Sequence, residues 1–206
     1  MSITLIIIIV TTIVSITGFS NKEWFQKLQF TPSAVIHRKE YWRLLTHAFL
    51  HANWFHLFIN MLVLFSFGVV VEYYFVGFFG MFKGKFIFLL LYLTSIFFSV
   101  LYSLQKHKND WFYNAVGASG AVSAVVFTSI FFEPWNMVYL FGLLPIPAII
   151  FGILYLIYSY QMSKRDTTDF IAHDVHFWGA VYGFVFPVLI NYKFIFLFLS
   201  KLFFID

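Results

Sequence analysis

Cysteine is absent from this 206-residue chain. A thiol nucleophile, a thiolate metal site and disulfide bonds are therefore excluded. Charge is scarce as well, since 11% of the residues are charged, whereas soluble domains carry about 25%. So few charges cannot form a water-facing shell, which argues against a soluble enzyme. The 13 Lys and Arg residues are scattered through the loops, which does not fit a nucleic-acid partner.

Hydrophobic residues make up 61% of the chain, and the mean hydropathy is +0.85. A helix needs about 20 mostly apolar residues to cross a bilayer. The apolar runs predict six such helices, at residues 3–19, 54–75, 86–104, 115–132, 136–160 and 170–192. We expect the fifth to be kinked at Pro145 and Pro147. The predicted fold class is an all-α membrane protein of six transmembrane helices in a lipid bilayer, with residues 1–206 as a single domain.

Two segments lie outside the predicted spans. Residues 20–53 combine cationic with aromatic side chains, which is typical of a long loop at the membrane interface. The C-terminal tail, 193–206, is apolar but short, so we expect it to lie along the interface. The first apolar run has no basic residue before it and no small-residue cleavage site after it, so we expect it to be retained.

Polar residues gather where the second, fourth and sixth spans begin. They include His51, His56 and Asn60, then Gly117 and Ser119, and finally Asp169, His173, Asp174 and His176. Polar side chains inside spans are costly, so they are candidates for function. Because every pair of crossings returns the chain to the same side, we expect the three groups to converge at one depth.

Ser119 stands in the sequence Gly117-Ala118-Ser119-Gly120, at a predicted helix start. The first N–H groups of a helix have no partner within it, and the helix dipole is positive there. Such donors can stabilise an oxyanion beside the serine hydroxyl. The alternative is that these small residues only form a packing face for another helix.

Histidine and amide side chains could complete such a site. His56 and Asn60 are four residues apart, so they share a helix face and can donate hydrogen bonds to a developing negative charge. Interhelical hydrogen bonding is the alternative for either residue. In the sixth span, His176 precedes the small-residue positions Gly179 and Gly183, which favour close packing on the fourth span and would place a base near Ser119.

Two other polar residues of the sixth span flank His176. Asp174 is two residues away, a rotation of about 200°, so we expect a Ser–His dyad and not a triad. His173 shares a face with His176. We expect it one turn nearer the surface, beside loop residues or water.

Together these residues resemble the rhomboid family of intramembrane serine proteases. The resemblance runs from Trp42 to Gly183. Its motifs are Trp42-Arg43, His51-x4-His56-x3-Asn60, Gly117-Ala118-Ser119-Gly120 and Ala172-His173-x2-His176-x2-Gly179-x3-Gly183. The resemblance implies a six-helix bundle with no cofactor and no metal.

The same resemblance assigns roles to individual residues. Ser119 would be the nucleophile and His176 the general base, and the Ser119 N–H with the side chains of His56 and Asn60 would form the oxyanion hole. Arg43 and Glu72 would brace the long first loop, and His47 and His51 would be structural. Many relatives stack a Tyr or Phe on the catalytic histidine from the position held here by Ser123, so another group must orient His176.

The resemblance also implies the activity. We expect an endopeptidase that cleaves peptide bonds in or next to transmembrane segments of membrane proteins through an acyl-enzyme. A compact chain of this kind resembles bacterial members, which points to the inner membrane. The family orientation puts both termini in the cytoplasm. It leaves nine Lys and Arg residues outside and four inside, opposite to the positive-inside rule.

Two other functions compete. A histidine-box membrane oxygenase would hold a metal on pairs such as His47 with His51 and His173 with His176, since imidazole is a common ligand. A non-catalytic rhomboid-like protein would bind membrane clients without cleaving them. Such proteins tend to lose the serine or the histidine, and both are present here.

Overall fold

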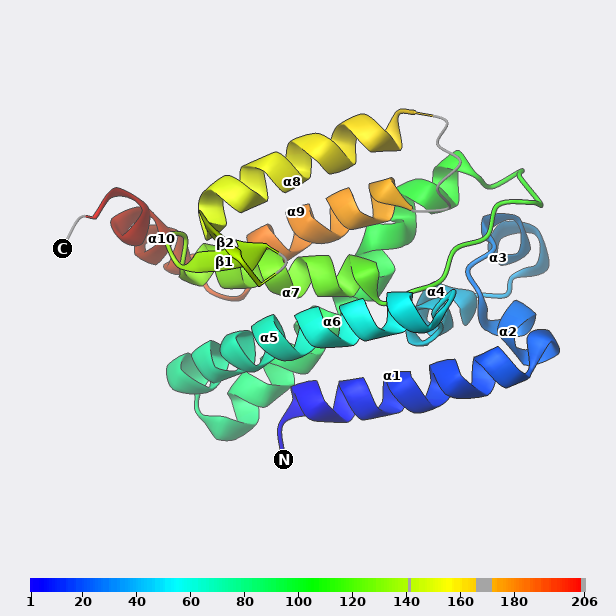
Figure 1. Cartoon of the computed structure of the whole chain (residues 1–206), viewed down its shortest axis with the longest axis horizontal. Coiled ribbons are helices and arrows are strands. Elements are labelled where there is room, and N and C mark those ends of the chain that lie inside the picture. The colour runs from blue at the N-terminus through cyan, green and yellow to red at the C-terminus, as the bar shows by residue number, and fades with distance from the viewer. Residues whose placement is uncertain (141, 166–171, 205–206) are drawn as a thin grey trace.

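A computed structural model describes residues 1–140, 142–165 and 172–204 as a bundle of helices (Figure 1). The long helices are α1 (Ile3–Ser20), α5 (Trp54–Phe79), α6 (Met81–Lys106), α7 (Ser119–Phe132), α8 (Ala148–Ser163) and α9 (His173–Ile190). The first loop contains the short helices α2 (Lys22–Leu28), α3 (Pro32–Arg38) and α4 (Arg43–Thr46), and the 3-10 turn η1 (His47–Phe49). Helix α10 (Phe194–Phe203) comes last.

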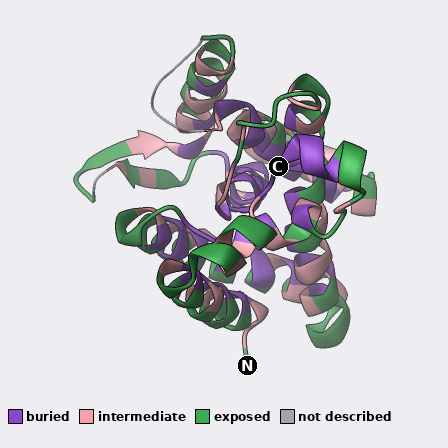
Figure 2. Ribbon diagram, turned by 90° about the vertical axis from the view of Figure 1, so that its right-hand side faces the viewer, coloured by how far each residue is buried: buried purple, intermediate pink, exposed green. Residues whose placement is uncertain are grey.

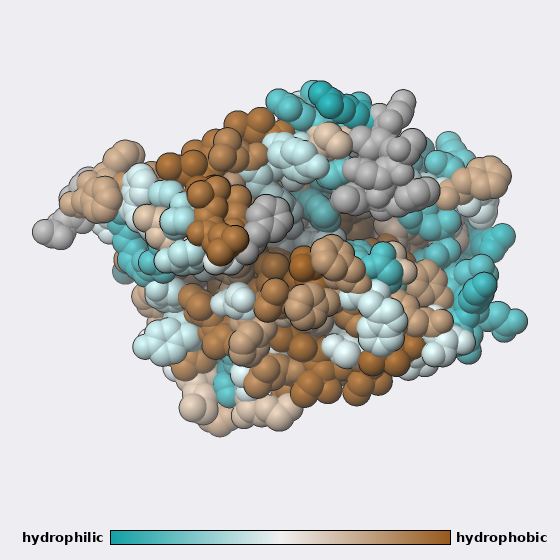
Figure 3. Space-filling model, in the orientation of Figure 1, coloured by the Kyte–Doolittle hydropathy of each residue, from teal (hydrophilic) through white to brown (hydrophobic). Residues whose placement is uncertain are grey.

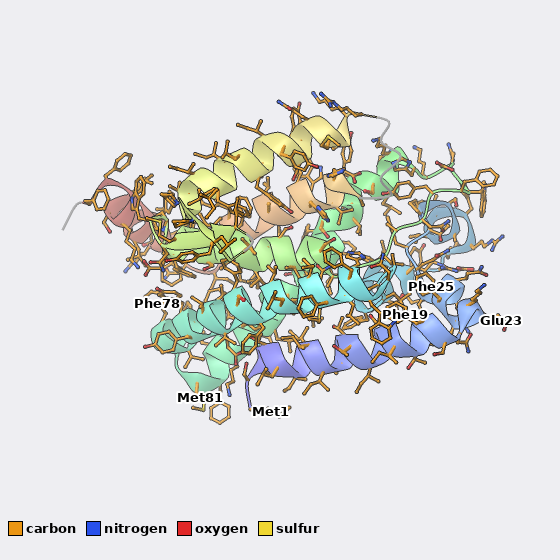
Figure 4. All side chains as sticks on the ribbon, viewed as in Figure 1. Met1, Phe19, Glu23, Phe25, Phe78 and Met81 are labelled. Atoms are coloured by element: carbon orange, nitrogen blue, oxygen red, sulfur yellow. The ribbon has the colours of Figure 1, made fainter. Side chains whose placement is uncertain are left out.

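The bundle has one polar end. Figure 4 places Glu23 and Phe25 at the end where the first loop lies, and Phe78 and Met81 at the opposite end, where α5 turns into α6. Hydrophilic side chains gather over the first-loop end, while a broad apolar face covers α1 and α5 (Figure 3). The first-loop end therefore has the character of a water-facing surface, and the face of α1 and α5 that of a lipid-facing one.

Helix α7 forms the core of the bundle. Every residue from Gly120 to Phe132 is buried, and exposed residues lie on the outside of the surrounding helices (Figure 2). Helix α9 runs parallel to α7 at very short range. A Cβ on Gly179 would lie 2.2 Å from the Gly120 oxygen, and one on Gly183 would lie 2.0 Å from the Ala124 oxygen. Only glycine permits this approach, as the predicted small-residue contact requires.

The helices support an integral membrane bundle, but their lengths alone do not establish six spans. Within the described ranges, α1, α5 and α6 are long and apolar enough to cross a bilayer. Helices α9 and α10 qualify only as a pair, bent by 118°, and α7 and α8 are apolar but shorter. The helical membrane fold is confirmed, and the count of six spans stays a prediction.

The predicted fifth span is wrong in its first half. Residues 136–147 contain an antiparallel hairpin of β1 (Met137–Leu140) and β2 (Leu144–Pro147), and α8 begins only at Ala148. Pro145 and Pro147 therefore belong to a strand and not to a helix kink. The physical reason is that proline lacks an N–H and forces the residue before it into an extended conformation. Gly142, with φ of 73°, lies in the turn.

Other predicted boundaries also shift. The fourth helix begins at Ser119 and not at residue 115, because Ala115 pairs with Phe30 of the first loop by two hydrogen bonds of 3.0 Å. The third helix extends to Met81 and Lys106. Helix α9 begins at His173, while Asp169 and the predicted start of the sixth span lie outside the described residues.

The tail after residue 193 contains α10, which turns sharply away from α9 and covers the end of α7. Phe194 and Phe198 are buried against Phe132 and Phe131. Lys201 fixes the helix because its Nζ donates to the Phe132 oxygen at 2.8 Å and pairs with the Glu133 carboxylate at 2.5 Å. Its position along a membrane interface stays a prediction.

Candidate active site

Ser119 is half-buried and is the first residue of α7. Two hydrogen bonds fix the backbone before it. The Gly117 N–H donates to the His47 oxygen at 3.0 Å, and the Ala118 N–H donates to His51 Nε2 at 3.4 Å. Gly117 has φ of 125°, a value that other residues rarely adopt. The loop therefore enters the helix in a fixed direction, and the Ser119 N–H has no intrahelical acceptor.

His176 is in the first turn of α9, the helix that packs on α7. The two helices are parallel, and Gly179 meets Gly120 while Gly183 meets Ala124. Ser119 directly precedes Gly120, and His176 stands three residues before Gly179, so both lie toward the start of this helix contact. Val175 supports this register, because a Cβ on Gly120 would lie 2.8 Å from its Cγ1. His176 is half-buried, like Ser119.

His56 packs directly on the backbone before Ser119. A Cβ on Gly117 would lie 2.7 Å from His56 Cε1 and 3.0 Å from Nε2, so a glycine is required here for lack of space as well as for its φ. His56 Nδ1 accepts from the Ala52 N–H at 3.4 Å. In the neutral ring the proton then belongs to Nε2, which is the nitrogen on the Gly117 side.

Asn60 lies one turn after His56 and is buried. Its Nδ2 donates to the His56 oxygen at 2.9 Å, a bond within its own helix. An amide nitrogen carries two N–H groups, so one more can serve another acceptor. The structure thus brings His56 to the serine loop, which is the segment of Gly117 and Ala118 just before Ser119. Asn60 uses one of its two N–H groups for a bond within α5.

Arg43 braces the first loop, as the resemblance implies. Its guanidinium donates to the backbone oxygens of Gln26 and Gln29 at 2.7 and 2.8 Å, and to the Glu40 carboxylate at 2.5 Å. The Arg43 oxygen lies 2.9 Å from His47 Nδ1, and His47 in turn accepts the Gly117 N–H. Arg43 and His47 therefore connect the first loop to the serine loop.

Glu72 does not brace the first loop. It lies toward the other end of α5 and accepts bonds from the N–H groups of Ile3 and Thr4 and from the hydroxyls of Ser2 and Thr4, at 2.6–3.0 Å. The carboxylate satisfies N–H groups at the start of α1, where negative charge is favoured. Its predicted role is corrected to that of holding α1 on α5.

His173 is buried, whereas the sequence predicted a position nearer the surface. It is 4% exposed because α8 covers it, and its ring lies edge-on to Tyr158, with centroids 5.7 Å apart. The His176 ring is edge-on to it as well, at 6.1 Å. The His173 ring therefore lies between Tyr158 of α8 and the His176 ring.

Sequence reasoning missed the partners of two polar residues. Ser123 shares a 2.7 Å hydrogen bond with the Tyr155 hydroxyl of α8. Asp174 faces α6, where the Ser103 hydroxyl donates to it at 2.6 Å, which agrees with the prediction that it points away from His176. The sequence offered only a weak signal for these contacts, namely polar residues in otherwise apolar runs.

A histidine-bound metal finds little support. Among the described residues, no group of three His, Asp or Glu side chains could hold a metal ion. His51, one of the proposed ligands, uses both ring nitrogens in contacts to Ser15 and Ala118. It cannot also ligate a metal in this arrangement.

Acid should destabilise the protein through the histidines of the first loop. Burial lowers the pKa of His47 to about 4 and, helped by the nearby His56, that of His51 to about 3. Since the unfolded value is about 6.5, the unfolded state takes up protons first, and stability present above pH 6.5 is lost as the pH falls toward 4. Thermal unfolding in detergent should show a falling midpoint over this range, and His51→Gln should reduce the slope.

The exposed His37 provides the control, because His37→Gln should leave the slope unchanged. A midpoint that stays constant or rises between pH 6.5 and 4 would contradict this assignment.

The apolar helices and their packing define an integral, multi-pass membrane protein. The model of the Rhomboid domain family matches residues 38–193, so the chain belongs to the rhomboid family, whose members are intramembrane serine proteases that act on transmembrane substrates. A comparison with curated proteins gives no match.

Proposed function

We propose that this chain is an intramembrane serine endopeptidase with Ser119 as nucleophile and His176 as general base. Residues 1–206 act as one membrane domain, with both termini in the cytoplasm of a bacterial cell and the domain in its inner membrane. The observation that carries the proposal is the contact of the parallel helices α7 and α9 through Gly120 and Gly179. Gly120 follows Ser119 directly, and Val175, which packs on Gly120, directly precedes His176, which supports the pairing of the two residues.

The chemistry follows from these positions. His176 takes the proton from Ser119 Oγ as the oxygen attacks the carbonyl carbon of the scissile peptide bond. The tetrahedral oxyanion accepts hydrogen bonds from the Ser119 N–H, His56 Nε2–H and the second N–H of Asn60. The C–N bond breaks as His176 returns the proton to the amine. Water, deprotonated by His176, then hydrolyses the Ser119 ester.

The half-buried position of Ser119 at the polar end of the bundle suits this reaction. Water reaches the site from the first-loop side, while a transmembrane substrate reaches it from the apolar side. Cleavage of a solubilised single-span substrate by the intact protein, compared with Ser119→Ala, tests the proposed function. An intact substrate after incubation with the folded wild-type protein would favour the non-catalytic alternative.

His56→Ala and Asn60→Ala should each lower kcat while the protein remains folded. Loss of a major oxyanion donor costs about 10²–10³ in rate, and because the Ser119 N–H remains, we expect roughly 10-fold or more for each variant. Steady-state cleavage of the same substrate measures this, with the exposed His37→Ala as control. Wild-type kcat in both variants would leave His56 and Asn60 with packing and structural hydrogen bonding as their only roles.

A further inference from the structure

Ser15 lies in α1, fully buried, and contacts the first loop. Its Oγ is 2.8 Å from the Phe49 oxygen and 2.9 Å from His51 Nδ1. A hydroxyl carries one proton, and a carbonyl oxygen can only accept, so Ser15 donates to Phe49. Toward His51 it must therefore accept, which puts the proton of the neutral imidazole on Nδ1.

The other nitrogen of His51 then has a lone pair for the serine loop. His51 Nε2 accepts the Ala118 N–H at 3.4 Å, and Ala118 is the residue before Ser119. Both His51 and Ala118 are fully buried, so water does not compete for these bonds. The low pKa of His51, about 3, keeps the ring neutral, with Nδ1 as the donor and Nε2 as the acceptor.

We propose that Ser15 is a positioning residue for Ser119, because it fixes the Nδ1–H tautomer of His51. His51 Nε2 then accepts the Ala118 N–H and so fixes the Gly117–Ala118 peptide, just before the nucleophile. With the opposite tautomer, Nε2–H would face the Ala118 N–H, and two donors would meet. The Gly117–Ala118 peptide would turn and displace the adjoining Ala118–Ser119 peptide, whose N–H donates to the oxyanion. This role rests on the proposed function of Ser119.

Ser15 lies outside residues 38–193, which the family model matches. Its contacts give the first helix a role beyond membrane anchoring. Thr11 lies one turn earlier in α1 and is equally buried, which makes it a matched control. Removing its hydroxyl in Thr11→Val changes the same helix without touching the first loop contact.

Nitrogen NMR of the whole protein, labelled with 15N-histidine in micelles, reads the tautomer without any substrate. The His51 signal is assigned by its loss in His51→Gln. We expect a protonated Nδ1 and an unprotonated Nε2 in the wild type and in Ser15→Thr, and loss of this pattern in Ser15→Ala. A wild-type His51 with the proton on Nε2, or an unchanged pattern in Ser15→Ala, would overturn the proposal.

Kinetics give the second readout. Ser15→Ala should lower kcat about 5-fold with KM unchanged, since a hydrogen bond worth about 1 kcal/mol net is lost and about 1.4 kcal/mol corresponds to tenfold. Ser15→Thr should restore kcat, and Thr11→Val should behave as wild type. An equal loss in Thr11→Val, or a full rate in Ser15→Ala, would refute a positioning role. If the wild type cleaves nothing, the proposed function fails. The nitrogen spectra still test whether Ser15 fixes the tautomer of His51.

Discussion

Ser119→Ala should reduce proteolysis to below about 1% of the wild-type rate, because loss of the nucleophile in a serine protease costs orders of magnitude. Ser119 is the hydroxyl at the start of α7, beside the loop fixed by Gly117 and Ala118. Removal of one oxygen from a half-buried site leaves the packing of α7 intact, so the variant should unfold at the wild-type temperature. Cleavage of a single-span substrate, followed by gel or mass spectrometry, gives the rate.

Ser129 supplies the control. It lies in the same helix, near the opposite end, and is buried, so Ser129→Ala should retain most of the activity. A fluorophosphonate should label the wild type and Ser129→Ala but not Ser119→Ala. Cleavage by Ser119→Ala above about 1% of wild type would remove Ser119 from the mechanism.

His176→Ala should lower activity to the level of Ser119→Ala, and the double variant should be no less active than either single one. Residues that act as a unit are non-additive, because the loss of one already abolishes the function of the other. Val175, the residue next to His176, packs on Gly120, the residue next to Ser119, which favours His176 as the partner of Ser119.

His173→Ala is the matched comparison in the same helix. His173 is buried between α8 and His176, so its removal should loosen His176 and lower kcat partially, with substantial activity left. An essential His173 with a dispensable His176 would mean that α9 is shifted by one turn relative to α7.

The sequence predicted the membrane helices well where apolar runs are long, as in α1, α5 and α6. It failed in residues 136–147, where Met, Val, Leu and Ile fill a hairpin. Apolar content does not distinguish a short strand from a helix. The start of α7 was also misplaced, since the pairing of Ala115 with Phe30 joins segments far apart in the chain.

The close approach of α9 to α7 followed from the motifs, because the glycine spacing in α9 dictates which residues can approach α7. The contacts of Glu72, His173 and Ser15 did not follow. Each depends on which helix lies opposite, which is a property of the tertiary packing. A polar residue in an apolar run signals that a partner exists, but it does not say which one.

The pairing of Ser119 with His176 is tested most directly by a peptidyl chloromethyl ketone. Ser119 adds to the ketone and thereby holds the chloromethyl carbon at the general base. The imidazole nitrogen of that base then displaces chloride from the carbon and stays alkylated. Mass spectrometry of the digested protein should find the alkyl group on His176 in the wild type and on no histidine in Ser119→Ala. Alkylation of His173, or equal alkylation of His176 in Ser119→Ala, would contradict the proposed dyad.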